Sequence, residues 1–207
     1  MTVFVSSDHH LGHTRICELA NRPWGSVDEM NTALIENHNT MVRPDDEVII
    51  VGDIVMGRRA DNLPMVGLMN GRKTLIVGNH DPMFPGEKQG VTAEKWREHY
   101  LDYFTSTIPW MTVVVPSSPT AIEFCHFPYR PDEYDHHRDG TGDRWADARV
   151  VDTGRWLCHG HTHNPSMFSG PRQLHIGVDA DWTAYGVPRY SPIPLDTIVD
   201  VIRGLER

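Results

Sequence analysis

The sequence predicts a layered αββα sandwich, in which two central mixed sheets are flanked by helices. Strand-like and helix-like segments alternate through the first half of the chain, and a run of strand-like segments follows in the second half. That order of elements is typical of layered α/β domains. The chain has 207 residues, 39% of them hydrophobic, so residues 1–207 are expected to form a single domain with a sizeable core.

Short apolar runs rich in β-branched residues predict three strands in the first half of the chain. They lie at residues 2–6, 47–51 and 73–77. A helix is expected to begin after Ser26, because Ser26 and Glu29 form a capping box ahead of apolar residues at helical spacing. Further helices are expected around residues 59–69 and at 92–104.

The second half of the chain is expected to be richer in strands. Residues 111–115 and 121–125 are expected to pair as a hairpin across a Pro-Ser-Ser-Pro turn. Further strand-like runs lie at residues 155–158, 173–178 and 197–202. Residues 128–147 are polar, charged and rich in turn formers, which predicts a surface loop or lid.

The composition excludes some classes of partner. The 19 Lys and Arg residues against 28 Asp and Glu give a net charge of −9, and an acidic surface repels duplex nucleic acid. No apolar run approaches the roughly 20 residues that span a bilayer, so no membrane partner and a cytoplasmic location are expected. Cys17, Cys125 and Cys158 form no CxxC pair, which predicts reduced thiols. The oligomeric state stays open.

Histidine is the unusual feature of the composition, with 13 residues. Five strand-like segments end in residues that commonly bind metals. These are Asp8 and His10; Asp53; Asn79, His80 and Asp81; His126; and His161 and His163. The carboxyl ends of neighbouring strands converge on one edge of an α/β sheet. Carboxylate, amide and imidazole ligands together favour ions such as Mn²⁺, Fe²⁺, Zn²⁺ or Ni²⁺.

The number of these ligands predicts two ions. About seven ligands exceed the needs of one open metal site and suit two ions that share a carboxylate, roughly 3.5–4 Å apart. Such a pair serves in-line displacement at phosphorus, because one ion lowers the pKa of a bound water to give hydroxide while both offset phosphoryl charge. A single histidine is more often structural, so the prediction depends on five clusters at successive strand ends.

The five clusters, in this order, resemble the signature blocks of the calcineurin-like metallophosphoesterases over about residues 3–180. The first block, residues 7–13, looks most like that of the small bacterial and phage-encoded phosphodiesterases. The resemblance implies two divalent ions as cofactors, with Mn²⁺ favoured. One ion would be held by Asp8, His10 and His163, the other by Asn79, His126 and His161, with Asp53 bridging them.

The resemblance also implies roles for residues that are not ligands. His80 would face the leaving oxygen, as a general acid or as a cation. Asp81 would orient His80 and raise its basicity. His13 would contact the substrate phosphate. Asp179 is expected to have no more than a supporting role.

The implied activity is the hydrolysis of small phosphodiesters, with cyclic nucleotides as expected substrates and the 2′,3′-cyclic ones favoured. A phosphomonoesterase or protein phosphatase is an alternative, but residues 52–58 lack the Asp-Arg pair of the family's protein phosphatases, and Asp81 replaces their Glu. That difference favours a diester over a dianionic monoester. The net charge of −9 disfavours a nuclease, and the complete ligand set disfavours a non-catalytic scaffold.

Overall fold

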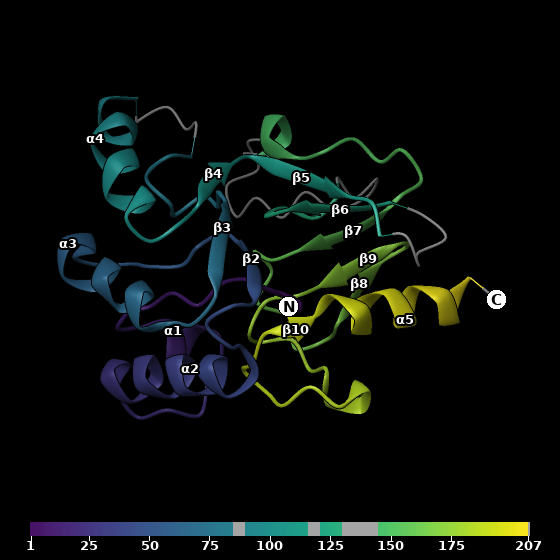
Figure 1. The fold of residues 1–207 in the computed structure, drawn as a ribbon, viewed down its shortest axis with the longest axis horizontal. Coiled ribbons are helices and arrows are strands. Elements are labelled where there is room, and N and C mark those ends of the chain that lie inside the picture. The colour runs from purple at the N-terminus through teal and green to yellow at the C-terminus, as the bar shows by residue number, and fades with distance from the viewer. Residues whose placement is uncertain (85–89, 116–120, 130–144, 207) are drawn as a thin grey trace.

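The computed structural model describes residues 1–84, 90–115, 121–129 and 145–206 and contains two five-stranded sheets (Figure 1). The first sheet has the order β10-β1-β2-β3-β4 and the second β5-β6-β7-β9-β8. The strands of the first sheet are β1 (Val3–Ser6), β2 (Glu47–Val51), β3 (Arg72–Ile76), β4 (Ser106–Ile108) and β10 (Ile193–Pro194). Those of the second are β5 (Trp110–Val113), β6 (Ile122–Cys125), β7 (Trp156–His159), β8 (Phe168–Gly170) and β9 (Gln173–His175).

Both sheets are mixed, as predicted. Strands β1 to β4 run parallel, and β10 joins β1 antiparallel. In the second sheet β6, β7 and β9 are parallel, with β5 and β8 antiparallel at the edges. The β5–β6 pairing confirms the predicted pairing of the two hairpin segments. Strands β1, β2 and β3 are parallel to one another, and so are β6 and β7. The carboxyl ends of each set therefore lie at one edge of its sheet, where residues of the two sheets can form a common site.

Helices cover the outer face of the first sheet. Their bounds are α1 (Ile16–Leu19), α2 (Val27–Met41), α3 (Arg59–Asn62) and α4 (Gly90–Leu101). The predicted capping box is confirmed, since the Ser26 side chain accepts a hydrogen bond from the Glu29 N–H at the start of α2. Met30 and Leu34 of α2 pack in one apolar cluster with Phe4 and Ile50 of the sheet. The predicted helix at 59–69 is α3 followed by a 3₁₀ turn, Leu63–Leu68, with Pro64 in its first turn.

The predicted strand at residues 197–202 is wrong: this segment lies in helix α5 (Leu195–Leu205), drawn in yellow in Figure 1. Its β-branched residues suggested a strand, but Leu195, Ile198, Val199 and Ile202 recur at helical spacing and are all buried. They pack in the second apolar cluster, which also joins residues of the two sheets, such as Val5 and Phe124. The helical period of the buried residues therefore outweighs their strand propensity.

The remaining predictions on the fold have mixed outcomes. Strand 173–178 is shorter than predicted, and the three cysteines are free thiols, as predicted. Of the predicted loop at 128–147, residues 130–144 lie outside the described residues. Over the outer face of the second sheet lies the segment around the 3₁₀ turn Ala146–Ala148, whose Ala148 carbonyl accepts a hydrogen bond from Cys125. None of the described helices is long and apolar enough to cross a bilayer.

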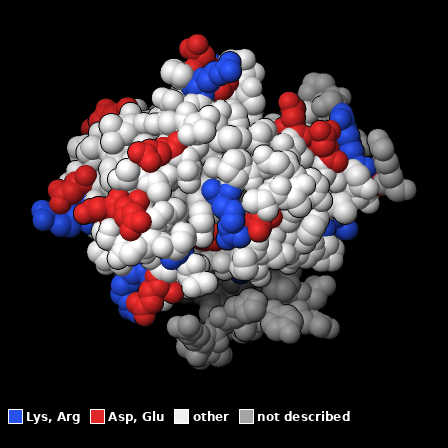
Figure 2. Space-filling model, turned by 90° about the horizontal axis from the view of Figure 1, so that it is seen from below, with Lys and Arg blue, Asp and Glu red and all other residues white. Residues whose placement is uncertain are grey.

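Charged side chains of both signs are interspersed on the described part of the face in Figure 2. Several exposed pairs lie within ion-pair distance, among them Arg58–Asp61 at 2.9 Å and Arg189–Asp181 at 2.9 Å. Exposed pairs of this kind contribute less than about 1 kcal/mol each. The fold is therefore held mainly by its two apolar clusters.

Candidate metal centre

Carboxylate and imidazole groups from both sheets meet at the ends of β1, β2, β6 and β7. Two overlapping groups have ligand atoms that all lie within 4.8 Å of one another. One consists of Asp8, His10 and His163, and the other of Asp8, Asp53 and His126. The structure thus brings together five of the seven predicted ligands in groups that could hold a metal ion, and Asn79 and His161 lie beside them, as described below.

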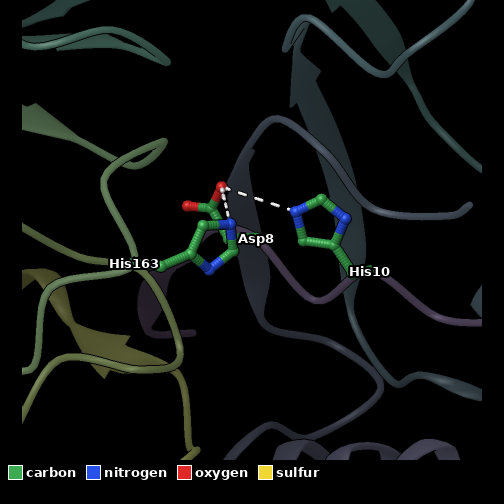
Figure 3. Close-up of side chains that lie close together, drawn as sticks. All are labelled: Asp8, His10 and His163. Carbon is green, nitrogen blue, oxygen red and sulfur yellow. Dashed lines mark ion pairs between the residues drawn. The ribbon is translucent and has the colours of Figure 1, made fainter. Parts of the chain in front are cut away.

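The first group surrounds the Asp8 carboxylate (Figure 3). Asp8 Oδ1 lies 4.0 Å from His10 Nε2 and 3.8 Å from His163 Nε2. Ligand atoms bonded to one ion at about 2.0–2.2 Å are separated by roughly 3–4 Å. His10 is 2% exposed, and its Nε2 has no hydrogen-bond partner among the described residues. A buried nitrogen without a partner beside two carboxylates fits a metal ligand, because an ion would satisfy it.

The second group surrounds His126, which is fully buried. Its Nε2 lies 3.0 Å from Asn79 Oδ1 and 3.4 Å from Asp53 Oδ2. Its Nδ1–H donates to the Val51 carbonyl at 2.9 Å, which directs Nε2 toward these two oxygens. The His161 ring centroid lies 5.2 Å from that of His126. Amide, carboxylate and imidazole atoms therefore face one point here, as the donor set of a divalent ion would.

The backbone at the ligand residues is strained. Among the described non-glycine residues with positive φ, five are predicted ligands: Asp8, His10, Asp53, His161 and His163, with φ from 50° to 68°. A left-handed conformation costs a non-glycine residue of order 1–3 kcal/mol and collects at functional sites. Five such residues around one point indicate that the fold holds these side chains in place at the expense of local stability.

Charge in the centre is distributed unevenly. Burial disfavours a charged His126, but the Asp53 carboxylate, aided by Asp8 and the Val51 carbonyl, raises its pKa to about 10. For Asp53, burial is outweighed by His126 and His10, so that its pKa lies below the usual range. Burial lowers the pKa of both His10 and His161 to about 3. In the metal-free protein the His126–Asp53 pair therefore holds a proton, whereas His10 and His161 are neutral.

Metal binding is expected to release a proton from His126. Below a pKa of about 10, an ion bound to His126 Nε2 must displace a proton. Affinity for Mn²⁺ should therefore rise about tenfold per pH unit between pH 7 and 9 and level off above the pKa. Titration calorimetry in buffers of different ionisation enthalpy measures the release. The His126→Asn variant should release one proton fewer than wild type, while the exposed His99→Asn serves as the control; equal release from both variants would contradict the assignment.

Residues 80 and 81 lie beside the centre. The ring of the exposed His80 has its centroid 5.5 Å from that of His10, and the backbone N–H of His80 donates to Asp53 Oδ1 at 2.8 Å. Asp81 Oδ2 accepts from the N–H groups of Gly78 at 2.8 Å and of Asp53 at 2.9 Å. Burial and the Asp53 charge raise the pKa of Asp81 to about 7. Asp81 thus ties the loop after β3 to that after β2, and its orientation of His80 stays a prediction.

The ring of His13 also lies beside that of His10, with ring centroids 5.5 Å apart. A cavity of about 540 Å³ lies near the centre, with Phe84, Trp110 and Phe127 among its lining residues. The Phe127 ring centroid is 5.0 Å from that of His126. None of the predicted ligands, all of which are described, lines this cavity. It is therefore a neighbour of the centre rather than a part of it.

Sequence reasoning missed Arg22. Its side chain is fully buried and pairs with Asp179, which in turn accepts a hydrogen bond from His163 Nδ1 at 2.7 Å. Arg22 stands between Asn21 and Pro23 and belongs to no motif, so nothing in the sequence singles it out. Asp179 follows a strand-like run, and its predicted supporting role agrees with the contact to His163.

Fold and site together define an α/β protein with a candidate metal centre between two mixed sheets. The chain is 31% identical to the Gene 66 protein of Mycobacterium phage D29, over 99% of this chain and 97% of that protein. It is 33% identical to the Gene 66 protein of Mycobacterium phage L5, over 84% and 85% of the two chains. The protein therefore belongs to the family of these Gene 66 proteins.

A solved structure supports the fold alone. The crystal structure of a protein of unknown function from Aquifex aeolicus superposes with a TM-score of 0.60 at 19% identity, over 97% of this chain and 99% of that one. The chain matches no protein-family model.

Proposed function

We propose that the protein is a metallophosphoesterase-like enzyme that uses two divalent ions to hydrolyse small phosphodiesters. The position of Asp53 carries the proposal: its Oδ2 lies 3.7 Å from His10 Nε2 and 3.4 Å from His126 Nε2. One carboxylate oxygen between two imidazoles of different ligand groups suits a ligand shared by two ions. Asp8, His10 and His163 would complete one site, and Asn79, His126 and His161 the other. Mn²⁺ is the favoured ion.

The bound ions would activate a water as nucleophile and offset the charge on the phosphoryl oxygens. Side chains of the protein would donate a proton to the leaving group and contact the substrate phosphate. His80 is exposed next to His10, so its imidazole can reach the leaving oxygen and donate a proton to it. His13, whose ring also lies beside that of His10, would contact a phosphate oxygen.

The arginines that follow Asp53 favour a diester substrate. Arg58 pairs with Asp61 at 2.9 Å, and Arg59 donates to the His80 carbonyl at 2.8 Å. A phosphate dianion is usually clamped by a bidentate arginine. The Nη2 of Arg59 is committed to the His80 carbonyl, and the Arg58 side chain lies on the surface, 88% exposed. A diester carries less charge and needs no such clamp, which supports small phosphodiesters as the substrate class. Cyclic nucleotides, with the 2′,3′-cyclic ones favoured, are proposed from the resemblance to the metallophosphoesterases.

Hydrolysis by metal-stripped protein reloaded with Mn²⁺ tests the proposal. The substrates are bis(p-nitrophenyl) phosphate, p-nitrophenyl phosphate, and 2′,3′- and 3′,5′-cyclic AMP. Diester cleavage that requires both metal and Asp53 is the expected result, with 2′,3′-cyclic AMP preferred. Cleavage of the monoester alone would indicate a phosphomonoesterase. No turnover by protein that holds two ions would contradict the proposal for this substrate class.

Removal of the His80 imidazole is expected to slow poor leaving groups most. A general acid matters when the leaving alkoxide is strongly basic, so His80→Ala should reduce cyclic-nucleotide hydrolysis by about 10²–10⁴-fold. The loss on bis(p-nitrophenyl) phosphate should be much smaller, because p-nitrophenolate leaves without a proton. Steady-state kinetics on both substrates measure the ratio, with the exposed His99→Ala as control. Equal losses on the two substrates would exclude the acid role and leave an electrostatic one.

A further inference from the structure

Arg22 makes an unusual set of contacts for a residue outside the ligand groups. Its side chain is 0% exposed and binds Asp179 through two bonds, Nε to Oδ1 at 2.8 Å and Nη2 to Oδ2 at 2.9 Å. Nη2 also donates to the Asp8 carbonyl at 2.7 Å, and Nη1 to the His9 carbonyl at 2.9 Å. One guanidinium thus joins a carboxylate that follows β9 to the backbone that follows β1.

The two carbonyls belong to the strained turn that presents the first ligands. Asp8 and His10 have φ of 59° and 53°, and Arg22 binds the carbonyl of Asp8 and that of His9 between them. Left-handed backbone persists only where surrounding contacts over-determine it. The guanidinium supplies such contacts, because charge-assisted hydrogen bonds are about twice as strong as neutral ones.

Asp179 links Arg22 to His163, the third candidate ligand of this group. Its Oδ2 accepts from His163 Nδ1 at 2.7 Å, so Nε2 of that ring faces Asp8 Oδ1 at 3.8 Å. A carboxylate behind an imidazole fixes the tautomer and the ring orientation of a metal ligand. Arg22 in turn holds both oxygens of that carboxylate. One buried ion pair therefore contacts all three candidate ligands or their turn: Arg22 binds the backbone of the turn that carries Asp8 and His10, and Asp179 binds the His163 ring.

We propose that Arg22 and Asp179 are positioning residues that assemble Asp8, His10 and His163 into one metal site. The proposal rests on the proposed function, because it presumes that this group holds an ion. A buried ion pair is weak evidence for stability, since apolar residues of similar volume are often as stable or more so. The hydrogen bonds to the Asp8 turn and to His163 give the pair a different role. The site of Asn79, His126 and His161 should depend on the pair much less, because Asp8 adjoins it through a hydrogen bond from the His161 N–H, 3.0 Å long, rather than as one of its proposed ligands.

Metal affinity in two backgrounds tests this selectivity. In the His126→Ala background a remaining ion reports on the site of Asp8, His10 and His163. In the His10→Ala background it reports on the site of Asn79, His126 and His161. Asp179→Asn and Arg22→Met are each expected to weaken Mn²⁺ binding about 10–100-fold in the first background. In the second background the same changes should alter affinity less than twofold. Arg22→Lys keeps the positive charge but not the bidentate guanidinium, so its Mn²⁺ affinity should lie between those of wild type and Arg22→Met.

The control is Arg155→Met, which removes a partly exposed ion pair with Glu123, 2.9 Å long, away from the turn. Arg22→Met leaves the Asp179 charge buried without its partner, so this variant is the one most at risk of not folding. In that case Asp179→Asn and the double variant Arg22→Met/Asp179→Asn test the proposal. Unfolding of the metal-free variants in chelator identifies those that fold. Unchanged affinity in the first background, or equal losses in both, would overturn the proposal. Wild-type protein that binds no Mn²⁺ would instead overturn the proposed function and this inference with it.

Discussion

Asp53→Ala is expected to abolish binding at both metal sites and to reduce diester hydrolysis by at least about a thousandfold. Asp53 Oδ2 is the oxygen that lies near both His10 and His126, so its loss removes a ligand from each group. The ions are expected to supply several kcal/mol of transition-state stabilisation, which sets the size of the effect. Asp8→Ala, in contrast, should mainly affect the ion held with His10 and His163. Elemental analysis of protein dialysed against Mn²⁺ measures both changes.

Two variants serve as controls for Asp53→Ala. The exposed Asp45→Ala removes a carboxylate two residues before β2 and should leave metal content unchanged. Asp53→Asn keeps the shape and the acceptor for the His80 N–H, so it separates the loss of charge from the loss of that hydrogen bond. Two ions still bound by Asp53→Ala would refute a shared carboxylate.

Gly160→Ala is expected to have the second large effect, through sterics rather than ligand loss. A Cβ at Gly160 would overlap Ser7 Oγ and Asp8 Oδ2 and would lie 3.0 Å from Ser7 Cβ. Asp8 is fully buried, so it has little space to yield. Overpacking of this kind costs about 1–3 kcal/mol of folding free energy. Movement of Asp8 should also weaken Mn²⁺ binding, which chemical denaturation and calorimetry on the same protein can follow.

Gly204→Ala is the matched control for that change. A Cβ at Gly204 has nothing within 4 Å, and the residue lies in the last turn of α5. Alanine is favoured over glycine in helices by up to about 1 kcal/mol, so this variant should be neutral or slightly more stable. If both glycine variants keep wild-type stability and metal affinity, the close approach of Gly160, the residue after β7, to Asp8 has no energetic consequence.

The long strands and the capped helix could be predicted because their signals are local. Apolar runs specify β1, β2 and β3, and Ser26 with Glu29 specifies the start of α2. Strands β4, β8 and β10 have only three, three and two residues, too few to show a period. The β-branched composition of helix α5 predicts a strand, but the spacing of its buried residues is helical.

The candidate site could be predicted as far as its residues directly follow strands. Parallel strands bring their carboxyl ends together, so Asp8 after β1 and Asp53 after β2 are predicted to be neighbours. His126 follows β6 of the second sheet, and its place beside them depends on how the two sheets pack. Contacts across long sequence separations leave no such signal. Arg22 reaches Asp179 over 157 positions, and only the folded chain shows the pair. The left-handed backbone of the ligand residues is likewise a property of the packed structure.

The candidate ligands are divided between the two sheets, with Asp8, His10 and Asp53 after strands of the first and His126, His161 and His163 after strands of the second. An ion coordinated by residues of both sheets would cross-link the two sheets. Ligand binding adds to folding free energy, by about 2.7 kcal/mol at a concentration of 100 times Kd. Chelation is therefore expected to lower the melting temperature by removing contacts between the two sheets, which the second apolar cluster still joins.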